Sequence, residues 1–389
     1  MVCGKTRHGQ SQGSSFEKAQ RRRSLSRALI VVLGLPSRLL QAARVANAGT
    51  VSTPVITARL RRRPFLAKIN MAQYSPIHCL QDVEGVPNAE LLPYSPELFP
   101  GFERFDLPGE GATIHGVIGG SGPPLLLVHG NPLTHVSWHK IAPSLARHYT
   151  VLIPDLRGYG DSSKPEGGGD HSAYSFRSMA KDLVAVARHF GFKRFPVVGH
   201  DRGARVGFRM ALDYAEMVSG LVAIDIVPTH HVLSNVTMGW GLEAYHWFFM
   251  AQKAPFPEKL LCADLPYYIQ YKLNKKGVGL EIFAPEAMKE YVRCTTPEQI
   301  HAVCEDYRAT VSVDFDMDKA DFGKKKITCP VMVLWGGNSH CGRHFKVIQA
   351  WSEWADQVQG CDLPTGHYPQ EQRPDLVYKA VWGFLHQGQ

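Results

Sequence analysis

The chain has 389 residues, of which 44% are hydrophobic and 10% aromatic, enough to bury one large domain or a core with a cap. Its formal net charge is +8, but residues 1–70 carry 14 Lys/Arg against one acid, whereas the remainder carries 29 against 34. The folded part is therefore mildly acidic, which argues against a nucleic-acid surface, and no run approaches the roughly 18 apolar residues of a membrane span.

Cysteine spacing and missing ligand motifs set the expectations for metals and cofactors. None of the eight cysteines forms a CxxC pair, so we expect reduced thiols of an intracellular protein. The chain contains no HExxH, GxxxxGKS/T or GxGxxG motif of the metal- or phosphate-binding kind. We therefore expect no metal and no cofactor.

Residues 1–70 are predicted to be a leader. They are rich in Arg and Ser and contain the short apolar stretch ALIVVLGL, a composition typical of a transit peptide for the mitochondrion or another organelle. A secretory signal is an alternative, because Ala46-Asn47-Ala48 resembles a cleavage site. Translation from Met71, which would leave the protein cytoplasmic, is another. We exclude the leader from the fold and treat residues 71–97 as an N-terminal extension.

Beyond residue 100, strand and helix patterns alternate. PPLLLVHG (123–130) is a continuous apolar run ending in Gly, as in a buried parallel strand. A second strand pattern within 148–162 leads to a helix at 176–191 that stops at Gly. Then follow a strand at 195–201, a helix at 202–214 and a strand at 218–228. This alternation predicts a mostly parallel sheet flanked by helices.

The alternation breaks between residues 229 and 325, which are aromatic-rich and mostly helical in pattern, as in AYHWFFM (244–250). Strand patterns return at 326–337 and 358–364, and an amphipathic helix at 374–387 closes the chain.

The predicted fold class is therefore α/β, in two core parts. Residues 98–228 form the first part and 326–389 the second. A helical cap at 229–325 is inserted between them, after the sixth strand.

A carboxylate at the centre of a strand-to-helix turn is the most informative feature. In GHDRG, Gly199 and Gly203 flank Asp201, and they permit the strained turn of a nucleophile elbow. Attack by a carboxylate on a carbonyl would give a mixed anhydride, whereas displacement at an sp³ carbon gives an alkyl ester that water can cleave. The turn therefore predicts an aspartate nucleophile for an sp³ carbon. The alternative is an ordinary turn with Asp201 as a helix N-cap.

Two arginines follow this aspartate. Arg202 and Arg205 are three residues apart at a helix start, so they share a face beside Asp201. Guanidinium groups suit a substrate that carries a carboxylate, which Arg grips bidentately, and they keep Asp201 ionised. The alternative is a surface ion pair. The backbone N–H groups of Arg202 and of Asn131, which follows His129-Gly130, are the predicted oxyanion donors.

Several segments occur together in one order: LLLVHGNPLTHVSWHKIAP, PDLRGYGDSSKP, GHDRGARV, DIVPTH, AYHWFFMAQKAPFPE, CEDYRA and TGHYPQE. On these segments, the chain from about residue 98 to its end resembles α/β-hydrolases of the haloacetate (fluoroacetate) dehalogenase type. That type is related to epoxide hydrolases and haloalkane dehalogenases. The resemblance implies the α/β-hydrolase fold with a cap.

The resemblance also implies the remaining site residues. His367, in the loop after the last strand, is the implied base, and Asp225 is the acid that orients it. The alternatives are a surface histidine and a helix-capping aspartate. His246, Trp247 and Tyr307 in the cap are the implied halide donors, and core packing is the alternative for each.

Two departures from the family concern the pocket. Fluoroacetate enzymes commonly have an aromatic residue at the position of Asn131, and HGNP instead resembles haloalkane dehalogenases. The stretch YKLNKKGVG (271–279) is more polar than the family leads one to expect.

The expected activity is hydrolytic dehalogenation of short 2-haloacids through a covalent ester on Asp201. The substrate would be a small halogenated acid, and a homodimer would be ordinary for the family. An epoxide hydrolase using the same Asp201, His367 and Asp225 is one alternative. A non-enzymatic ligand-binding protein on a hydrolase scaffold is the second.

Overall fold

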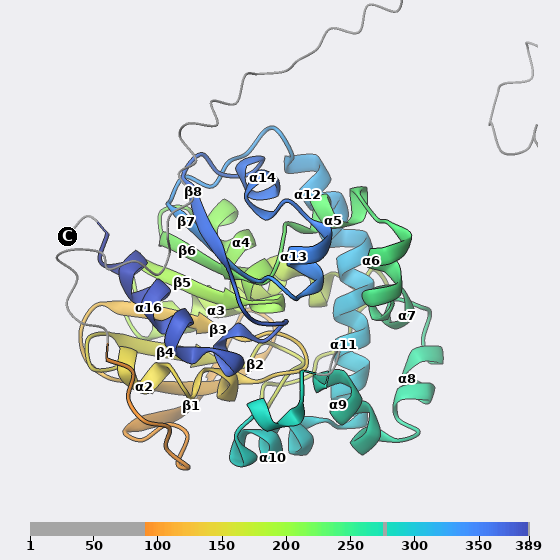
Figure 1. Cartoon of the computed structure of the whole chain (residues 1–389). Helices are drawn as coiled ribbons and strands as arrows, with labels where there is room; N and C mark the ends of the chain where they lie inside the picture. Colours follow the sequence, from red (N-terminus) through yellow and green to blue (C-terminus); the bar gives the residue numbers. More distant parts are fainter. Residues whose placement is uncertain (1–89, 275–277, 388–389) are drawn as a thin grey trace, which may run out of the picture. The chain divides into compact units, whose positions relative to one another are not determined.

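The computed structural model describes residues 90–274 and 278–387 (Figure 1). The predicted leader and most of the predicted extension at 71–97 lie outside these residues, as does part of the polar stretch 271–279.

One eight-stranded sheet forms the centre of the fold. The strand order is β1-β2-β4-β3-β5-β6-β7-β8, with β1, β2 and β4 paired antiparallel and the remaining neighbours parallel. The predicted parallel strands are confirmed, whereas the β1–β2 hairpin was not predicted. The strands are β1 (Phe102–Pro108), β2 (Thr113–Gly119), β3 (Pro124–Val128), β4 (Thr150–Pro154), β5 (Phe195–His200), β6 (Val218–Ile224), β7 (Val331–Gly336) and β8 (Val358–Leu363).

The central strands are apolar on both faces because each face packs on its own hydrophobic core. Along β3, Leu125 and Leu127 belong to one core cluster, whereas Leu126 and Val128 belong to the other. Successive strand side chains point to opposite faces, so a strand covered on both sides is a continuous apolar run.

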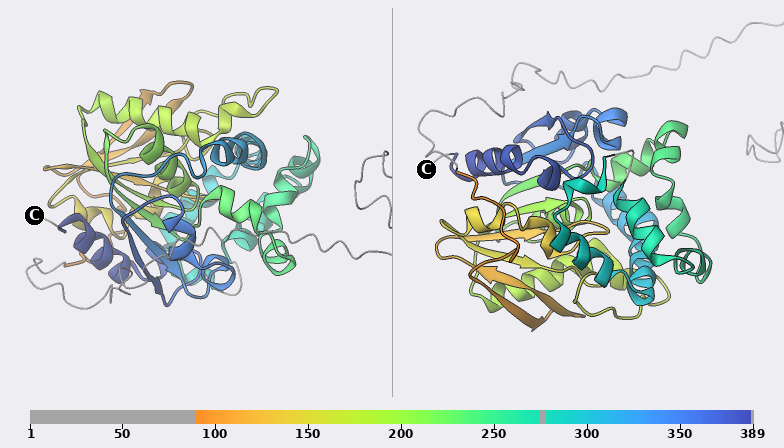
Figure 2. Two further views of the ribbon diagram at one scale, coloured as in Figure 1. Left: turned by 90° about the horizontal axis from the view of Figure 1, so that it is seen from above. Right: turned by 60° about the horizontal axis from the view of Figure 1, so that its bottom comes forward.

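Helices cover the two faces of the sheet. Residues of α3, α4 and α14 pack in one cluster, and residues of α2 and α16 pack in the other. Figure 2 shows α3 and α16 on opposite sides of the sheet. The helices outside the insertion are α2 (Ala142–Leu145), α3 (Phe176–His189), α4 (Arg202–Asp213), α13 (His340–His344), α14 (Val347–Ser352), α15 (Pro369–Gln372) and α16 (Pro374–Leu385).

In the described part of the chain between β6 and β7, eight α-helices form what is called the helical insertion below. In Figure 1 they lie to one side of the sheet. A single π-helical turn at Thr310–Asp314 joins the last two. The helices are α5 (Thr229–Ser234), α6 (Met238–Glu243), α7 (His246–Met250), α8 (Phe256–Leu261), α9 (Leu265–Leu273), α10 (Pro285–Cys294), α11 (Pro297–Ala309) and α12 (Phe315–Asp321).

Across the stretches of chain that the structure describes, no helix combines the length and apolar character that crossing a bilayer requires.

Candidate active site

Asp201 occupies a strained turn between β5 and α4. Its backbone has φ 47° and ψ −112°, a region that non-glycine residues rarely enter. The flanking glycines make the turn possible, since a Cβ at Gly199 would lie 2.5 Å from the Gly203 carbonyl oxygen. Asp201 stands at the N-cap position of α4, but its side chain makes no capping hydrogen bond, so the carboxylate does not serve as a cap.

The loop after β3 brings a donor to this carboxylate. The backbone N–H of Asn131 donates to Asp201 Oδ1 over 3.0 Å. An oxyanion formed on the Asp201 carboxyl carbon would lie on such an oxygen, so this N–H has the geometry of an oxyanion donor. The N–H of Arg202, in the first turn of α4, stays the predicted second donor.

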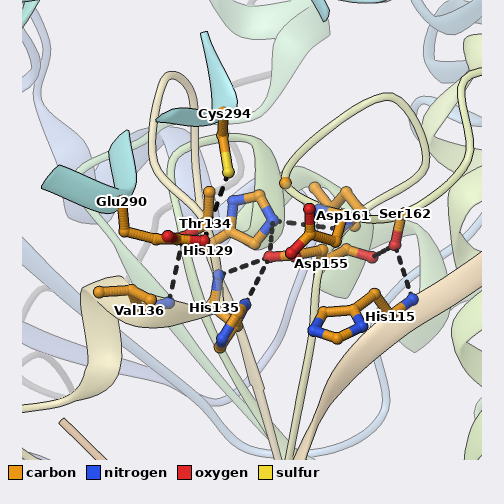
Figure 3. Close-up of polar contacts among 12 residues, drawn as sticks. His115, His129, Thr134, His135, Val136, Asp155, Asp161, Ser162, Glu290 and Cys294 are labelled. Carbon is orange, nitrogen blue, oxygen red and sulfur yellow. Dashed lines mark hydrogen bonds and ion pairs between the residues drawn. The ribbon is translucent and has the colours of Figure 1, made fainter. Parts of the chain in front are cut away.

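A buried network behind this loop holds it in place (Figure 3). Asp155, just after β4, accepts from the backbone N–H of His135 at 2.7 Å and from its Nδ1 at 3.0 Å. Burial lowers the pKa of His135, but the Asp155 charge more than reverses this and raises it, which favours the protonated imidazole beside Asp155. His129 stays neutral, because its Nε2 accepts from Leu156 N–H and burial lowers its pKa.

His367 lies between two carboxylates. Its Nδ1 is 2.6 Å from Asp225 Oδ2, and its Nε2 is 3.7 Å from Asp201 Oδ2. His367 is only 5% exposed, so the alternative of a surface histidine is wrong. The 3.7 Å distance exceeds that of a direct hydrogen bond, so Nε2 lies near the Asp201 carboxylate without a hydrogen bond to it.

Asp225 is fixed by donors from the chain after β7. Its Oδ1 accepts from Gly336 N–H at 2.9 Å and from the Ser339 hydroxyl at 2.6 Å. Burial raises the pKa of Asp225, and His340, Ser339 and Gly336 partly offset this. The helix-capping alternative is wrong, because both oxygens are engaged elsewhere and Pro228 holds the cap position of α5.

The nucleophile candidate is held as a carboxylate. Burial raises the pKa of Asp201, but the charges of His367, Arg202, His200 and Arg205 outweigh burial and bring the pKa far below its usual range. Burial lowers the pKa of neighbouring His200 to about 4, so that ring is neutral at pH 7.

Three buried arginines follow one another along α4, and the middle one differs from its neighbours. Arg202 pairs with Asp306 at 3.2 Å, and Arg209 pairs with Asp318. Arg205 has no carboxylate within ion-pair distance among the residues described, although it is only 3% exposed. The alternative of a surface ion pair for Arg205 is therefore wrong.

The hydrogen bonds of Arg205 leave part of its guanidinium group unused. Its Nη1 donates to Val227 O at 3.0 Å and to Thr229 Oγ1 at 2.9 Å, whereas its buried Nε has no hydrogen-bond partner in the described chain. Burial, and then Arg202, lower the pKa of Arg205 to about 10, so the group stays charged at neutral pH. Its Cζ lies 4.8 Å from the Trp247 ring centroid.

The three residues of the predicted halide site come together. His246 and Trp247 at the start of α7 are 5.6 and 6.1 Å from Tyr307 of α11, measured between ring centroids, and all three are buried. Asn131 Nδ2 donates to the Tyr307 hydroxyl at 3.2 Å. Burial raises the pKa of Tyr307 to about 12, so the phenol keeps its proton and remains a donor.

In the described part of the chain, two groups of His and Asp side chains are close enough together to bind a metal ion. In both groups, however, the carboxylate already accepts hydrogen bonds. Asp155 Oδ1 accepts from His135, and Asp225 Oδ2 accepts from His367. A metal would have to displace these bonds, so the donor sets fit a structural network and a catalytic pair better than a metal site. The groups are His115, His135 and Asp155, and Asp225, His340 and His367.

Two functional partners were missed from the sequence. Asp306, which neutralises Arg202, directly precedes Tyr307, and Ser339 binds Asp225 from across the sheet edge. The signal for Asp306 was indirect: Arg202 and Arg205 share one helix face, and two cations on one face require an acid nearby when they are buried. No local signal identifies Ser339.

The chain is similar to known α/β hydrolases in both sequence and structure. Residues 123–374 match the family model described as the alpha/beta hydrolase fold. The chain is 41% identical over 290 residues to a fluoroacetate dehalogenase of Burkholderia sp., which covers 74% of this chain and 95% of that protein. It is 33% identical over 281 residues to a soluble epoxide hydrolase of Corynebacterium sp. (strain C12), covering 71% and 94%. A solved structure from Nostoc sp. PCC 7120, described as an α/β hydrolase, has 46% identity and a TM-score of 0.72, covering 74% and 98%.

Proposed function

The chain belongs to the α/β-hydrolase family and is a hydrolase, and from this premise we propose that it removes halide from short 2-haloacids. The observation that carries the proposal is Arg205, a buried guanidinium without a carboxylate partner in the described chain, one helical turn from Asp201. A substrate carboxylate supplies the missing anion. The alternative of a non-enzymatic binding protein is set aside, because the chain is a hydrolase.

The first step is displacement at the α-carbon. Arg205 and Arg202 hold the substrate carboxylate, and Asp201 attacks the carbon that bears the halogen. A carbon–oxygen bond forms to Asp201 as the carbon–halogen bond breaks, and the halide leaves with its electron pair. His246, Trp247 and Tyr307 donate hydrogen bonds to the departing halide.

The second step is hydrolysis of the aspartyl ester. His367 Nε2 takes a proton from water, which attacks the Asp201 carboxyl carbon, and Asp225 stabilises the resulting imidazolium. The Asn131 and Arg202 N–H groups stabilise the oxyanion. The tetrahedral intermediate then collapses, and its leaving alkoxide takes the proton from His367, so that the 2-hydroxyacid leaves with the former Asp201 oxygen. The second proton of the water passes to solvent, and Asp201 is again a carboxylate.

Oxygen labelling tests both steps. In ¹⁸O-water, with enzyme in excess over chloroacetate, the first turnover should give unlabelled glycolate and place the label in the Asp201 carboxylate. Mass spectrometry of glycolate and of the peptide containing Asp201 measures both. Label in the glycolate with none in Asp201 would mean that water attacks the substrate directly.

Asn131 bears on the choice of halide. Its side-chain Nδ2 donates one hydrogen to the Tyr307 hydroxyl, which leaves its second N–H as a further halide donor beside Tyr307. The order of halide-release rates from fluoroacetate, chloroacetate and bromoacetate measures the preference, and Asp201→Asn is the control that should release none.

Epoxide hydrolysis is the second candidate, supported by the epoxide hydrolase relative. It would use the same Asp201, His367 and Asp225, with Tyr307 protonating the epoxide oxygen. The guanidinium of Arg205 favours the acid substrate. Diol formation from an aryl epoxide without halide release from any haloacid would favour the epoxide instead.

A further inference from the structure

Tyr159 joins the core of the protein to the helical insertion through a buried hydrogen bond. It lies in the loop after β4, and its hydroxyl donates to Asp306 Oδ2 of α11 at 2.6 Å. Both side chains are fully buried. A hydrogen bond from a hydroxyl to a carboxylate at this distance is charge-assisted and strong. The reaction steps above do not use Tyr159, and its bond fixes the carboxylate of Asp306.

Asp306 and Thr310 together bind one nitrogen of Arg202. Nη1 donates to Asp306 Oδ1 at 3.2 Å and to Thr310 Oγ1 at 2.5 Å. The Thr310 hydroxyl donates its own hydrogen to the backbone oxygen of Asp306 at 2.8 Å, which leaves its oxygen as an acceptor for Arg202. Nη1 carries two hydrogens, so both are in use. The guanidinium group is therefore held by its Nη1 side.

The other edge of the Arg202 guanidinium group has no partner. Its Nε and Nη2 are buried and make no hydrogen bond to any of the described residues. Arg157 uses the same two nitrogens to bind Asp182, at 2.5 and 2.7 Å. Arg177 uses them to bind Asp213, at 2.7 and 3.1 Å. Arg202 thus keeps available the edge with which arginine binds a carboxylate.

The guanidinium group of Arg202 lies among the side chains of the proposed site. Its Cζ is 3.7 Å from the Tyr307 ring centroid and 5.2 Å from the Trp247 ring centroid. Arg205 Cζ is 4.8 Å from the same Trp247 centroid, so both guanidinium groups lie against one ring of the predicted halide site. A misplacement of about 1 Å in a group that positions a substrate can cost about 100-fold in rate. The residues that fix Arg202 therefore bear on substrate binding.

We propose that Tyr159 and Thr310 are positioning residues that hold the guanidinium group of Arg202. With Nη1 fixed, the Nε–Nη2 edge is the one that Arg202 offers to the substrate carboxylate. This inference rests on the proposed function, in which Arg202 and Arg205 hold that carboxylate. Neither Tyr159 nor Thr310 touches the substrate, and Arg205 remains the cation without a carboxylate partner in the described chain.

Two substitutions remove these hydroxyl groups without changing a charge. Tyr159→Phe removes the donor to Asp306, and Thr310→Val removes an acceptor of Arg202 in a side chain of similar shape. Each should raise the KM for chloroacetate about 5- to 30-fold, as expected for the loss of one hydrogen bond. The kcat should change less than about threefold, because the nucleophile and the base are untouched. Thr310→Ser keeps the hydroxyl and should keep the KM within about threefold of the wild-type value.

Tyr174→Phe is the matched control. Tyr174 is fully buried in the same hydrophobic cluster as Tyr159, and its hydroxyl donates to the carbonyl oxygen of Pro165 at 2.6 Å. Removing this hydroxyl should lower the melting temperature and leave the KM unchanged, since Pro165 has no bond to Arg202. A KM rise of equal size in Tyr174→Phe and Tyr159→Phe would trace the effect to general loosening of the fold and overturn the inference.

A double-mutant cycle shows whether Tyr159 acts through Arg202. Arg202→Lys retains a cation for Asp306 but lacks the planar edge that binds a carboxylate with two nitrogens. In that background Tyr159→Phe should change the KM for chloroacetate less than about twofold, because no such edge is left to position. An undiminished rise in that background overturns the inference.

Acetate binding separates this inference from the proposed function. Acetate has the carboxylate of the substrate but no leaving group, so calorimetry measures its affinity whether or not the enzyme releases halide. Affinity that falls about fivefold or more in Tyr159→Phe, but not in Tyr174→Phe, supports the inference even if no haloacid is cleaved. Thr310→Val takes the place of Tyr159→Phe if that variant does not fold. Unchanged affinity overturns the inference even if the enzyme is a dehalogenase, and so does failure of the wild-type protein to bind acetate.

Discussion

Replacing Arg205 with Met tests the carboxylate site most directly. The variant removes the guanidinium whose Nε has no partner within the described residues, while Met retains apolar bulk against Trp247. We expect kcat/KM for haloacids to fall, mainly through KM.

The expected size follows from the contacts. A hydrogen bond to a charged group contributes about 1.5–3 kcal/mol, which corresponds to a fall of about 10- to 150-fold in kcat/KM. Asp201 should stay ionised without Arg205, because His367 and Arg202 are the larger causes of its low pKa. The chemical step, and with it kcat, should therefore change little.

Arg209→Met is the control from the same helix. Arg209 contacts Asp318, and its Nη1 lies 2.8 Å from Asp321 Oδ2 and 3.4 Å from Asp213 Oδ1. Removing it leaves a buried carboxylate unpaired, which costs about 3–5 kcal/mol of stability. This variant should melt at a lower temperature but keep its KM.

Halide release across a range of chloroacetate concentrations gives kcat and KM, and circular dichroism gives the melting temperature. In Arg205→Met only two acceptors, Val227 O and Thr229 Oγ1, lose their donor, so the stability loss should be smaller than in Arg209→Met. If Arg205→Met keeps its KM within about threefold, the substrate carboxylate does not lie on Arg205.

Three further predictions concern the base and its surroundings. His367→Gln should form the ester but not cleave it, so intact-protein mass spectrometry should show an adduct on Asp201. Ser339→Ala removes the 2.6 Å donor to Asp225 and should slow ester hydrolysis about 5- to 30-fold in single-turnover kinetics. Burial lowers the pKa of His200 to about 4, whereas an unfolded histidine titrates near about 6.5. Between these pH values only the unfolded chain binds the proton, so the free energy of unfolding falls by about 3 kcal/mol as pH drops from about 6.5 to about 4. His200→Gln should flatten that part of the pH dependence in urea unfolding.

Each of these has a result that would contradict it. Normal turnover by the His367→Gln variant would show that His367 is not the base. An unchanged hydrolysis rate in Ser339→Ala would mean that Gly336 N–H and His367 hold Asp225 without the serine. An undiminished pH slope in His200→Gln would place the acid sensitivity in other groups, and buried His129 is the first to test, since burial also lowers its pKa.

The β1–β2 hairpin was not predicted from the local sequence pattern. β1 lies at the edge of the sheet, and its residues are either partly buried or exposed, so its sequence has no long apolar run. The buried parallel strands β3 and β5 were predicted because both of their faces are apolar.

The sequence by itself predicted the buried parallel strands, the helices between them and the strained turn at Asp201. Strand and helix periodicity and the paired glycines around Asp201 are local properties, which neighbouring residues specify without the rest of the chain. Only the tertiary structure decided how the charges are paired. Arg202 meets Asp306 from 104 residues away, Asp225 meets Ser339 from 114, and Tyr159 meets Asp306 from 147. The partner of a buried charge depends on which residues the packing of distant segments brings close to it. The periodicity of the sequence describes single helices and strands, so it does not predict these pairs.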